Sequence, residues 1–432
     1  MNDFKTQLVK EKGHGEIAES IYSEEPIGTL TLRKALSLAL MKNPELSAFS
    51  WEIRAREAQQ LQTSLLPNPE LEGEMGEFGG QGQREGSKAA ETTILLSQLF
   101  EVAGKRSKRT RVASLDRELA EWDYESKRLD VLARVTRTFV DLLAAQEHAA
   151  LDEELVGISK KILSVVSQRV KAGKISPLEE TKAKVILARA KIERGQSQAI
   201  LKTVRKRLSL SWGSPTADFD RAEGDLMTVH PLPNQEALVS ALDKNPDLAR
   251  WSTEIESHQA TVNLEKANRF PDPSLSGGIQ YFNETDDSAF VVGLSIPLPL
   301  FDRNQGNVLE AQSRLAKAEE ERREAYLQVQ MLLAEAYQGL CAAYLEVISI
   351  RDEILPGAEE AFDAAFEGYR LGKFGFLEVL DAQRTFFEVR HQYMDSLASY
   401  HKAVADVERL VGQRLGAVQA IKRVPKEEDH EK

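Results

Sequence analysis

The stretch LPNPEL at residues 66–71 returns about 200 residues later as FPDPSL at residues 270–275. Three further pairs recur in the same order: NPEL (43–46) with NPDL (245–248), AGK (172–174) with LGK (371–373), and the dipeptide WG (212–213) with VG (411–412). Four anchors in one order and at nearly one offset predict two copies of one structural unit. We expect the copies at residues 29–212 and 235–412, with an N-terminal extension at 1–28, a linker or equatorial segment at 213–234 and a charged tail at 413–432.

Each copy is expected to begin with helix and then to change its period. Residues 29–66 and 235–270 show helical spacing of apolar residues, interrupted where proline follows asparagine. Residues 67–101 and 271–301 then predict β-hairpins, because apolar residues such as Leu275, Ile279 and Tyr281 alternate with small or polar ones. Strands of about nine to eleven residues are long enough to cross a hydrocarbon layer when tilted.

A very long helix is predicted after each hairpin, at residues 102–171 and 303–371. Roughly 70 residues would make about 100 Å of helix, which suits a coiled-coil-like or tubular assembly rather than a globular domain. A tight glycine turn then leads into a returning helix, at residues 177–212 and 376–412. The fold class predicted is therefore mostly α with a small β part.

Composition excludes several functions. The formal charge of −12 argues against nucleic acid as a partner, because phosphate binding needs a basic face. The seven histidines are scattered and none pairs at i, i+4, and no catalytic serine motif or phosphate-binding glycine loop occurs, so we expect no metal site, no cofactor and no enzymatic activity. The single cysteine, Cys341, is interpreted as a core residue.

Export signals are not visible in the sequence. Residues 1–28 lack the apolar segment of a signal peptide, and no uninterrupted apolar run of about 18 residues predicts a transmembrane helix. Two interpretations stay open: a cytosolic protein, or an exported one whose signal peptide is missing from this chain.

Four predicted strands are too few for a closed membrane barrel and leave two exposed edges. Closure requires either several chains or burial of the edges by other elements. Three chains would supply about twelve strands, which is within the range of membrane barrels.

Two stretches carry a resemblance to a known family. The stretch YRLGKFGFLEVLDA (369–382), together with the duplication and the order of elements, resembles the TolC-type outer membrane efflux family, and LSIPLPLFDRN (294–304) is similar to its heavy-metal cation-efflux branch. The resemblance covers nearly all of residues 29–412. It implies a homotrimer whose twelve-stranded β-barrel in outer membrane lipid continues as a long α-helical tunnel through the periplasm. It also implies two partners, a periplasmic adaptor (membrane fusion) protein and an inner-membrane pump of the resistance-nodulation-division (RND) class.

The same resemblance implies functional positions at the two turns between long helices. The adaptor-docking tips would be formed by Gly173, Lys174, Leu178 and Glu179, and by Gly372, Lys373 and Leu377. The periplasmic gate would be formed by Glu378 and Asp381, which are three residues apart and so project from one helix face. Copy one has Lys182 where copy two has Asp381, so only the second tip is expected to line the constriction. Members of the metal branch often carry a lipid on an N-terminal cysteine. Met1 begins this chain, so that anchor has been removed or this member lacks it.

The function expected is passive export of heavy-metal cations through an outer membrane duct that spans into the periplasm. Two alternatives remain: a duct of the same fold for drugs and other organic compounds, or a water-soluble coiled-coil scaffold or adaptor whose hairpins pack on their own helices.

Overall fold

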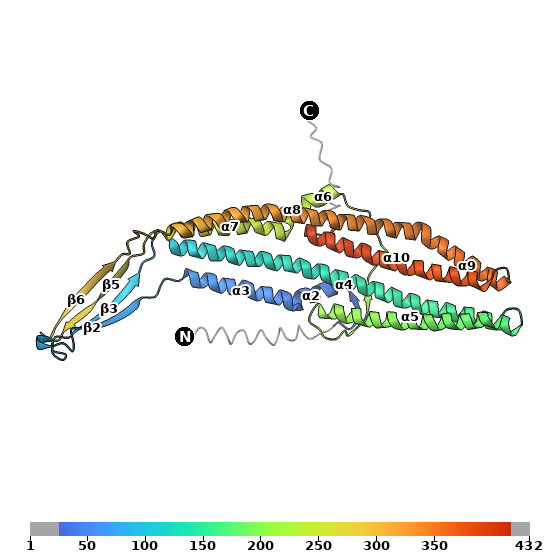
Figure 1. The fold of residues 1–432 in the computed structure, drawn as a ribbon, viewed down its shortest axis with the longest axis horizontal. Coiled ribbons are helices and arrows are strands. Elements are labelled where there is room, and N and C mark those ends of the chain that lie inside the picture. The colour runs from blue at the N-terminus through green and yellow to red at the C-terminus, as the bar shows by residue number, and fades with distance from the viewer. Residues whose placement is uncertain (1–25, 416–432) are drawn as a thin grey trace, which may run out of the picture. The chain divides into compact units, whose positions relative to one another are not determined.

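The computed structural model describes residues 26–415, so the predicted extension before residue 26 and the predicted tail beyond residue 415 lie outside it. The described chain is mostly helical with a small β part, which confirms the predicted fold class (Figure 1). Labels follow Figure 1. The first copy contains β1 (Gly28–Thr31), α2 (Leu32–Lys42), α3 (Pro44–Ser64), β2 (Glu70–Gly76), β3 (Glu91–Leu99), α4 (Lys105–Lys171) and α5 (Pro177–Leu210).

The second copy repeats this order with small additions. It contains β4 (Phe219–Glu223), α6 (Gln235–Ala241), α7 (Pro246–Ala267), β5 (Ser274–Phe282), β6 (Asp287–Ser295), α8 (Gln305–Ser349), α9 (Leu355–Leu371) and α10 (Phe376–Val411). Short 3-10 turns lie at Gly82–Arg84 and Leu242–Lys244.

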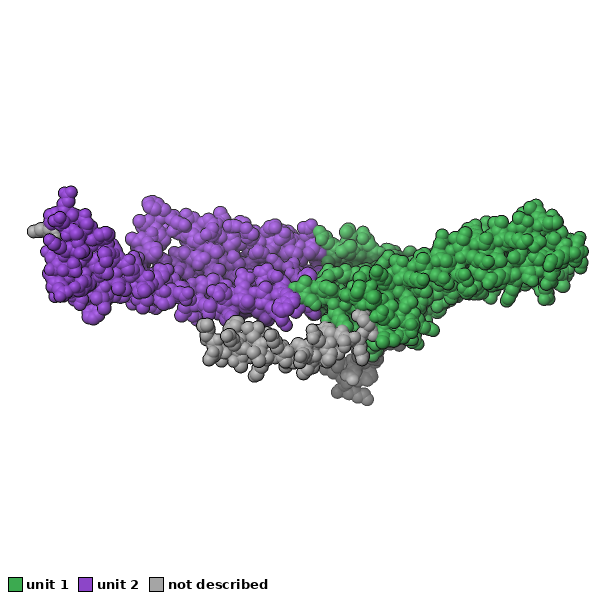
Figure 2. Space-filling view, turned by 90° about the horizontal axis from the view of Figure 1, so that it is seen from below, with its two compact units in different colours: residues 1–48, 125–245, 327–432 green, residues 49–124, 246–326 purple. Residues whose placement is uncertain are grey.

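The chain divides into two compact units (Figure 2). Within the described residues, unit 1 comprises residues 26–48, 125–245 and 327–415, and unit 2 comprises residues 49–124 and 246–326. Unit 2 therefore holds both β-hairpins, and unit 1 holds both of the turns that join long helices.

The repeated Asn-Pro and apolar-Gly anchors meet in unit 1. Asn43 is buried, its Oδ1 accepts the backbone N–H groups of Glu45 and Leu46 at 2.9 and 3.1 Å, and its Nδ2 donates to the Ser211 carbonyl at 2.7 Å. Asn245 is also buried, and its Nδ2 donates to the Leu410 carbonyl at 2.6 Å. Each asparagine thus joins a helix break to the end of the returning helix of its own copy.

One prediction about the start of the first copy is wrong. Residues 29–31 were expected to be helical, but they belong to β1, which pairs in parallel with β4, inside the predicted linker or equatorial segment 213–234, as a two-stranded sheet. Leu30 pairs with Ala222 in this register, and both are buried along with Phe219. The strands form because apolar side chains from segments almost 200 residues apart share one core, and neither segment is long enough to show a period by itself.

The four hairpin strands form one antiparallel sheet in unit 2, in the order β2-β3-β5-β6 (Figure 1). Its register places Ile94 opposite Ile279 and Ile279 opposite Phe290, so one face is a continuous apolar row. Phe290 is 89% exposed and Leu71 is 75% exposed. β2 has seven residues, fewer than expected, and is followed by Glu77 with a φ of 56°.

The predicted helix 303–371 is not continuous. A five-residue π-helical segment, Ile350–Ile354, separates α8 from α9. Pro356 explains it, because proline has no N–H to donate and its ring clashes with the carbonyl four residues earlier. Judged by length and composition alone, the helical stretch Gln305–Leu371 is apolar enough to cross a membrane, and the mean hydropathy of its most apolar 18-residue window is 1.2. The sequence did not predict this, because charged residues interrupt every apolar run in the stretch. Only 17% of that window is buried.

Candidate functional site

The first tip is the turn between α4 and α5. Gly173 has a φ of 71°, a left-handed conformation in which glycine avoids steric cost. The Lys174 N–H donates to the Arg169 carbonyl at 3.0 Å, which closes the end of α4. Ser176 then caps α5, because its Oγ accepts the Leu178 N–H at 3.2 Å. The sequence therefore sets this turn by local rules.

The second tip, between α9 and α10, has a glycine at the equivalent position and, in addition, a phenylalanine ring packed against the helix. Gly372 has a φ of 79°, and the Lys373 N–H donates to the Gly368 carbonyl at 2.8 Å. The Phe374 ring lies against Gly368, where an added Cβ would be 2.1 Å from a ring carbon. The role of Gly368 was not predicted, because a glycine inside a helix shows its purpose only when the side chain packed against it is known.

The two tips pack together at one end of unit 1 (Figure 1). The buried cluster between them consists of Ile162, Val166, Ala183, Tyr369, Phe376 and Val379. Arg169 of the first tip also contacts Tyr369 of the second tip. Its Nη1 donates to the Tyr369 carbonyl at 2.5 Å, and its guanidinium lies 4.6 Å from the centre of the Tyr369 ring. Burial, together with the nearby Glu179, raises the pKa of the Tyr369 hydroxyl.

The residues predicted for docking differ in how they are presented. Leu178 and Leu377 are both exposed, at 59% and 63%, although large apolar side chains are usually covered. The lysines of both turns, Lys174 and Lys373, are exposed beside them. Glu179 is only half-buried and lies 3.5 Å from the Tyr369 hydroxyl. The tip surface thus combines exposed leucines with lysines.

The predicted gate carboxylates are both exposed at the start of α10. Asp381 forms an ion pair with Arg384 at 2.8 Å, and the side chains of both residues are about 70% exposed. Glu378 lies in the first turn of α10 and folds back toward Gly375, where an added Cβ would be 2.6 Å from its Oε2. A carboxylate there also stabilises the helix start. The structure therefore brings the pair to one helix face and gives Asp381 a local partner in Arg384.

A polar seam between α4 and α10 was not predicted. Helix α4 of the first copy runs antiparallel to α10 of the second, and side chains pair across it at regular intervals: Asp130 with Arg409, Arg137 with Asp406, Asp141 with Lys402, Glu154 with Arg390, and Ser159 with Gln383. These partners are more than 220 residues apart. The seam joins the two tip hairpins along their length within unit 1.

Two histidines meet in the middle of this seam. His148 Nδ1 lies 2.6 Å from His391 Nδ1, and the two ring planes are nearly parallel, with centroids 4.9 Å apart. His148 Nε2 is 2.9 Å from Asp395, and His391 Nε2 is 3.0 Å from the buried Asp152. The sequence analysis treated these histidines as scattered, because they are 243 residues apart and only the helix pairing brings them together.

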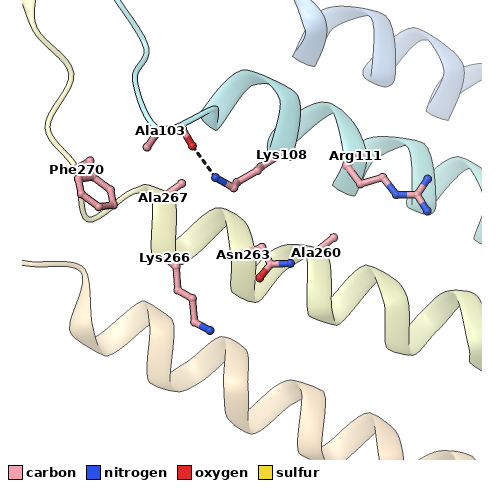
Figure 3. Close-up of a pocket in the computed structure, with 8 residues that line it drawn as sticks. All are labelled: Ala103, Lys108, Arg111, Ala260, Asn263, Lys266, Ala267 and Phe270. Atoms are coloured by element: carbon pink, nitrogen blue, oxygen red, sulfur yellow. Dashed lines mark hydrogen bonds between the residues drawn. The ribbon is translucent and has the colours of Figure 1, made fainter.

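A pocket in unit 2 lies between the start of α4 and the end of α7 (Figure 3). It has a volume of 330 Å³, and its charged lining side chains are all basic: Lys108, Arg111 and Lys266. Lys108 donates to the Ala103 carbonyl at 2.5 Å, and Arg111 is paired with Glu256. A basic lining repels cations, so this pocket is not suited to a cationic cargo.

Comparison with known families decides the class of protein. Residues 35–214 and, separately, residues 237–413 match one family, described as outer membrane efflux protein, and each match falls in one copy of the repeated anchors. The chain belongs to this family. The family predicted from the sequence is therefore confirmed.

Relatives of this outer membrane efflux protein include two metal-resistance proteins. It is 35% identical to the cobalt-zinc-cadmium resistance protein CzcC of Cupriavidus metallidurans, over 91% of this chain and 92% of that protein. It is 25% identical to the nickel-cobalt-cadmium resistance protein NccC of Alcaligenes xylosoxydans xylosoxydans, over 69% of this chain and 66% of that protein. A crystal structure of CusC, described as forming a transmembrane channel, has the same fold, with a TM-score of 0.74 at 17% identity, covering 90% of this chain and 95% of that one.

The family also settles two further predictions. This efflux protein is located in the outer membrane and is a channel protein rather than an enzyme. The water-soluble scaffold alternative is therefore set aside.

Proposed function

We propose that three copies of this chain form a duct that carries heavy-metal cations across the outer membrane, as the outer part of a tripartite RND-type export system. The observation that carries the proposal is the sheet of unit 2. Within the described residues, its outer strands β2 and β6 each pair on one side only. Unpaired backbone groups cannot face lipid, so sister copies would have to complete the cylinder, and three copies give about twelve strands.

The two faces of the sheet support a position in lipid. One face presents exposed apolar side chains, among them Leu71, Phe290 and Val292. The other carries Glu70, Glu72 and Glu74 along β2. An apolar outer face and a polar inner face are the pattern of a membrane barrel that encloses water.

The helices of unit 1 also carry unpartnered apolar side chains. Leu178, Val185 and Ile192 recur at seven-residue spacing along α5, and all are exposed. A seven-residue apolar stripe is the contact seam of supercoiled helices. Sister copies in a helical tube would cover Val185 and Ile192, while Leu178, at the tip, stays accessible to the adaptor.

Metal cations are proposed as cargo because the relatives CzcC and NccC are resistance proteins for cobalt, cadmium, zinc or nickel. The adaptor would dock on the tips through Gly173, Lys174, Leu178 and Glu179 of copy one and through Gly372, Lys373 and Leu377 of copy two. The exposed leucines supply apolar contact area there, and the pump would be reached through the adaptor.

The gate is proposed at Glu378 and Asp381. In a trimer these residues would form two stacked rings of carboxylates, which attract cations and close when bridged by positive groups. Arg384, already paired with Asp381, is the nearest such group on the same helix.

The test is complementation of a strain that lacks the gene, challenged with cobalt, zinc, cadmium and nickel and with a panel of organic drugs. Restored growth on metals but not on drugs is expected. Restored growth on drugs alone would overturn the cargo and favour the organic-compound alternative. Native mass spectrometry of the detergent-extracted protein checks the assembly, and a monomer there would overturn the duct.

A further inference from the structure

We propose that His148 and His391 form a binding site for one borderline divalent cation, such as Zn²⁺ or Co²⁺, which links α4 to α10. Neither residue belongs to the tips or to the gate. The inference does not rest on metal as cargo, because the site is defined by the seam itself.

The first argument is the contact between the two rings. Two Nδ1 atoms 2.6 Å apart cannot both present lone pairs without a positive centre between them. That centre is either a shared proton or a metal ion.

The second argument is the state of the other ring nitrogens. Each Nε2 faces a carboxylate that can only accept, Asp395 for His148 and Asp152 for His391. Both Nε2 atoms must therefore carry hydrogen, which leaves both Nδ1 atoms as the available ligand positions. Histidines that bind metals usually donate their second N–H to a carboxylate in this way, which orients the ring and raises its basicity.

Proton balance follows from the same contacts. Without metal, a hydrogen bond joins the two Nδ1 atoms, and its proton lies between them. Binding of the cation forms two metal–nitrogen bonds and releases that proton to solvent. Two carboxylates beside two neutral imidazoles leave a local charge that a divalent cation offsets.

Access and size also permit a cation at this place. The side chains of His148 and His391 are 21% and 31% exposed, so a cation can reach them. Zinc–nitrogen bonds of about 2.0–2.1 Å in tetrahedral geometry require the two nitrogens to move apart by roughly 0.7 Å, which small ring rotations allow. Within residues 26–415 no group of three or more His, Cys, Asp or Glu side chains is placed to hold a metal ion, so water would complete the coordination and the ion would exchange readily.

The experiment is isothermal titration of the metal-free, full-length protein in detergent with ZnCl₂, in two buffers of different ionisation enthalpy. We expect one Zn²⁺ bound per chain and about one proton released. The variants His148→Gln and His391→Gln should each weaken binding by more than about tenfold, and Asp152→Asn by about 10–100-fold. His258→Gln is the matched control, because His258 is partly exposed on α7, far along the chain from both proposed ligands, and pairs with Glu254 at 3.5 Å.

The variant Asp395→Asn distinguishes a loss of Zn²⁺ binding from a loss of folding. The Asp395 side chain is 72% exposed, so its replacement should leave the fold intact while weakening binding by about tenfold or more. The proposal is overturned if the wild-type protein binds no stoichiometric Zn²⁺, in which case the pair holds only a proton. It is also overturned if the Asp395 and His148 variants, folded by circular dichroism, bind as tightly as the His258 variant.

Discussion

Replacing Val292 by arginine tests whether the apolar face of the sheet lies against lipid. Val292 is 78% exposed and is the sixth of the nine residues of β6. A strand of nine residues spans about 30 Å, so Val292 lies within about 4 Å of its middle. An arginine on the lipid face of a membrane barrel near the bilayer midplane costs about 2–4 kcal/mol. Three copies in one trimer would lose about 6–12 kcal/mol if the costs add.

The matched control is Val291→Arg. Val291 is the preceding residue of β6 and therefore points to the opposite face, which we assign to the lumen. The assay is equilibrium unfolding by guanidinium from lipid vesicles, followed by circular dichroism. Val292→Arg should lower the free energy of unfolding by the amount above, and Val291→Arg by less than about 1 kcal/mol. Equal losses, or a larger loss for Val291→Arg, would refute the orientation of the sheet.

Three further predictions concern unit 1. Asn43→Ala and Asn245→Ala should each lower the free energy of unfolding by about 1–3 kcal/mol, because each removes the hydrogen bond that a buried asparagine donates to a backbone carbonyl at the end of the returning helix. Thermal melting measures this, and an unchanged melting temperature would contradict it. Replacing Glu378 and Asp381 together with alanine should raise the ion conductance of the reconstituted trimer in planar bilayers, and unchanged conductance would remove them from the gate. Burial lowers the pKa of His401, so the stability it contributes is present above the unfolded pKa of about 6.5 and is lost as the pH falls through the lower folded value. His401→Gln keeps a donor for its hydrogen bond and should reduce the loss of melting temperature between pH 7 and pH 5; an unaltered pH profile would count against this assignment.

Local rules determined much of this protein. Glycine at 173 and at 372 ends a helix, Ser176 and Pro177 begin the next, and alternating apolar residues define the strands. These features involve neighbours within a few residues, so they appear in the sequence as short patterns. The duplication made them easier to recognise, because each pattern occurs twice.

Some local segments were misassigned for a physical reason. β1 has four residues and β4 has five, too few to show a period, and they form strands only because they pair with each other and bury Leu30 and Phe219. Similarly, the π-helical segment before Pro356 arises from a clash between a ring and a carbonyl one turn away. A scan of apolar spacing does not register either effect.

The sequence by itself determined the repeat, the helices with their tight turns, and the family. Only the tertiary structure decided the seam between α4 and α10, the packing of Phe374 on Gly368, and the pairing of His148 with His391. Those contacts depend on which faces of two long helices meet and in what register. Register is set by the sum of many packed side chains, so no short stretch of sequence records it.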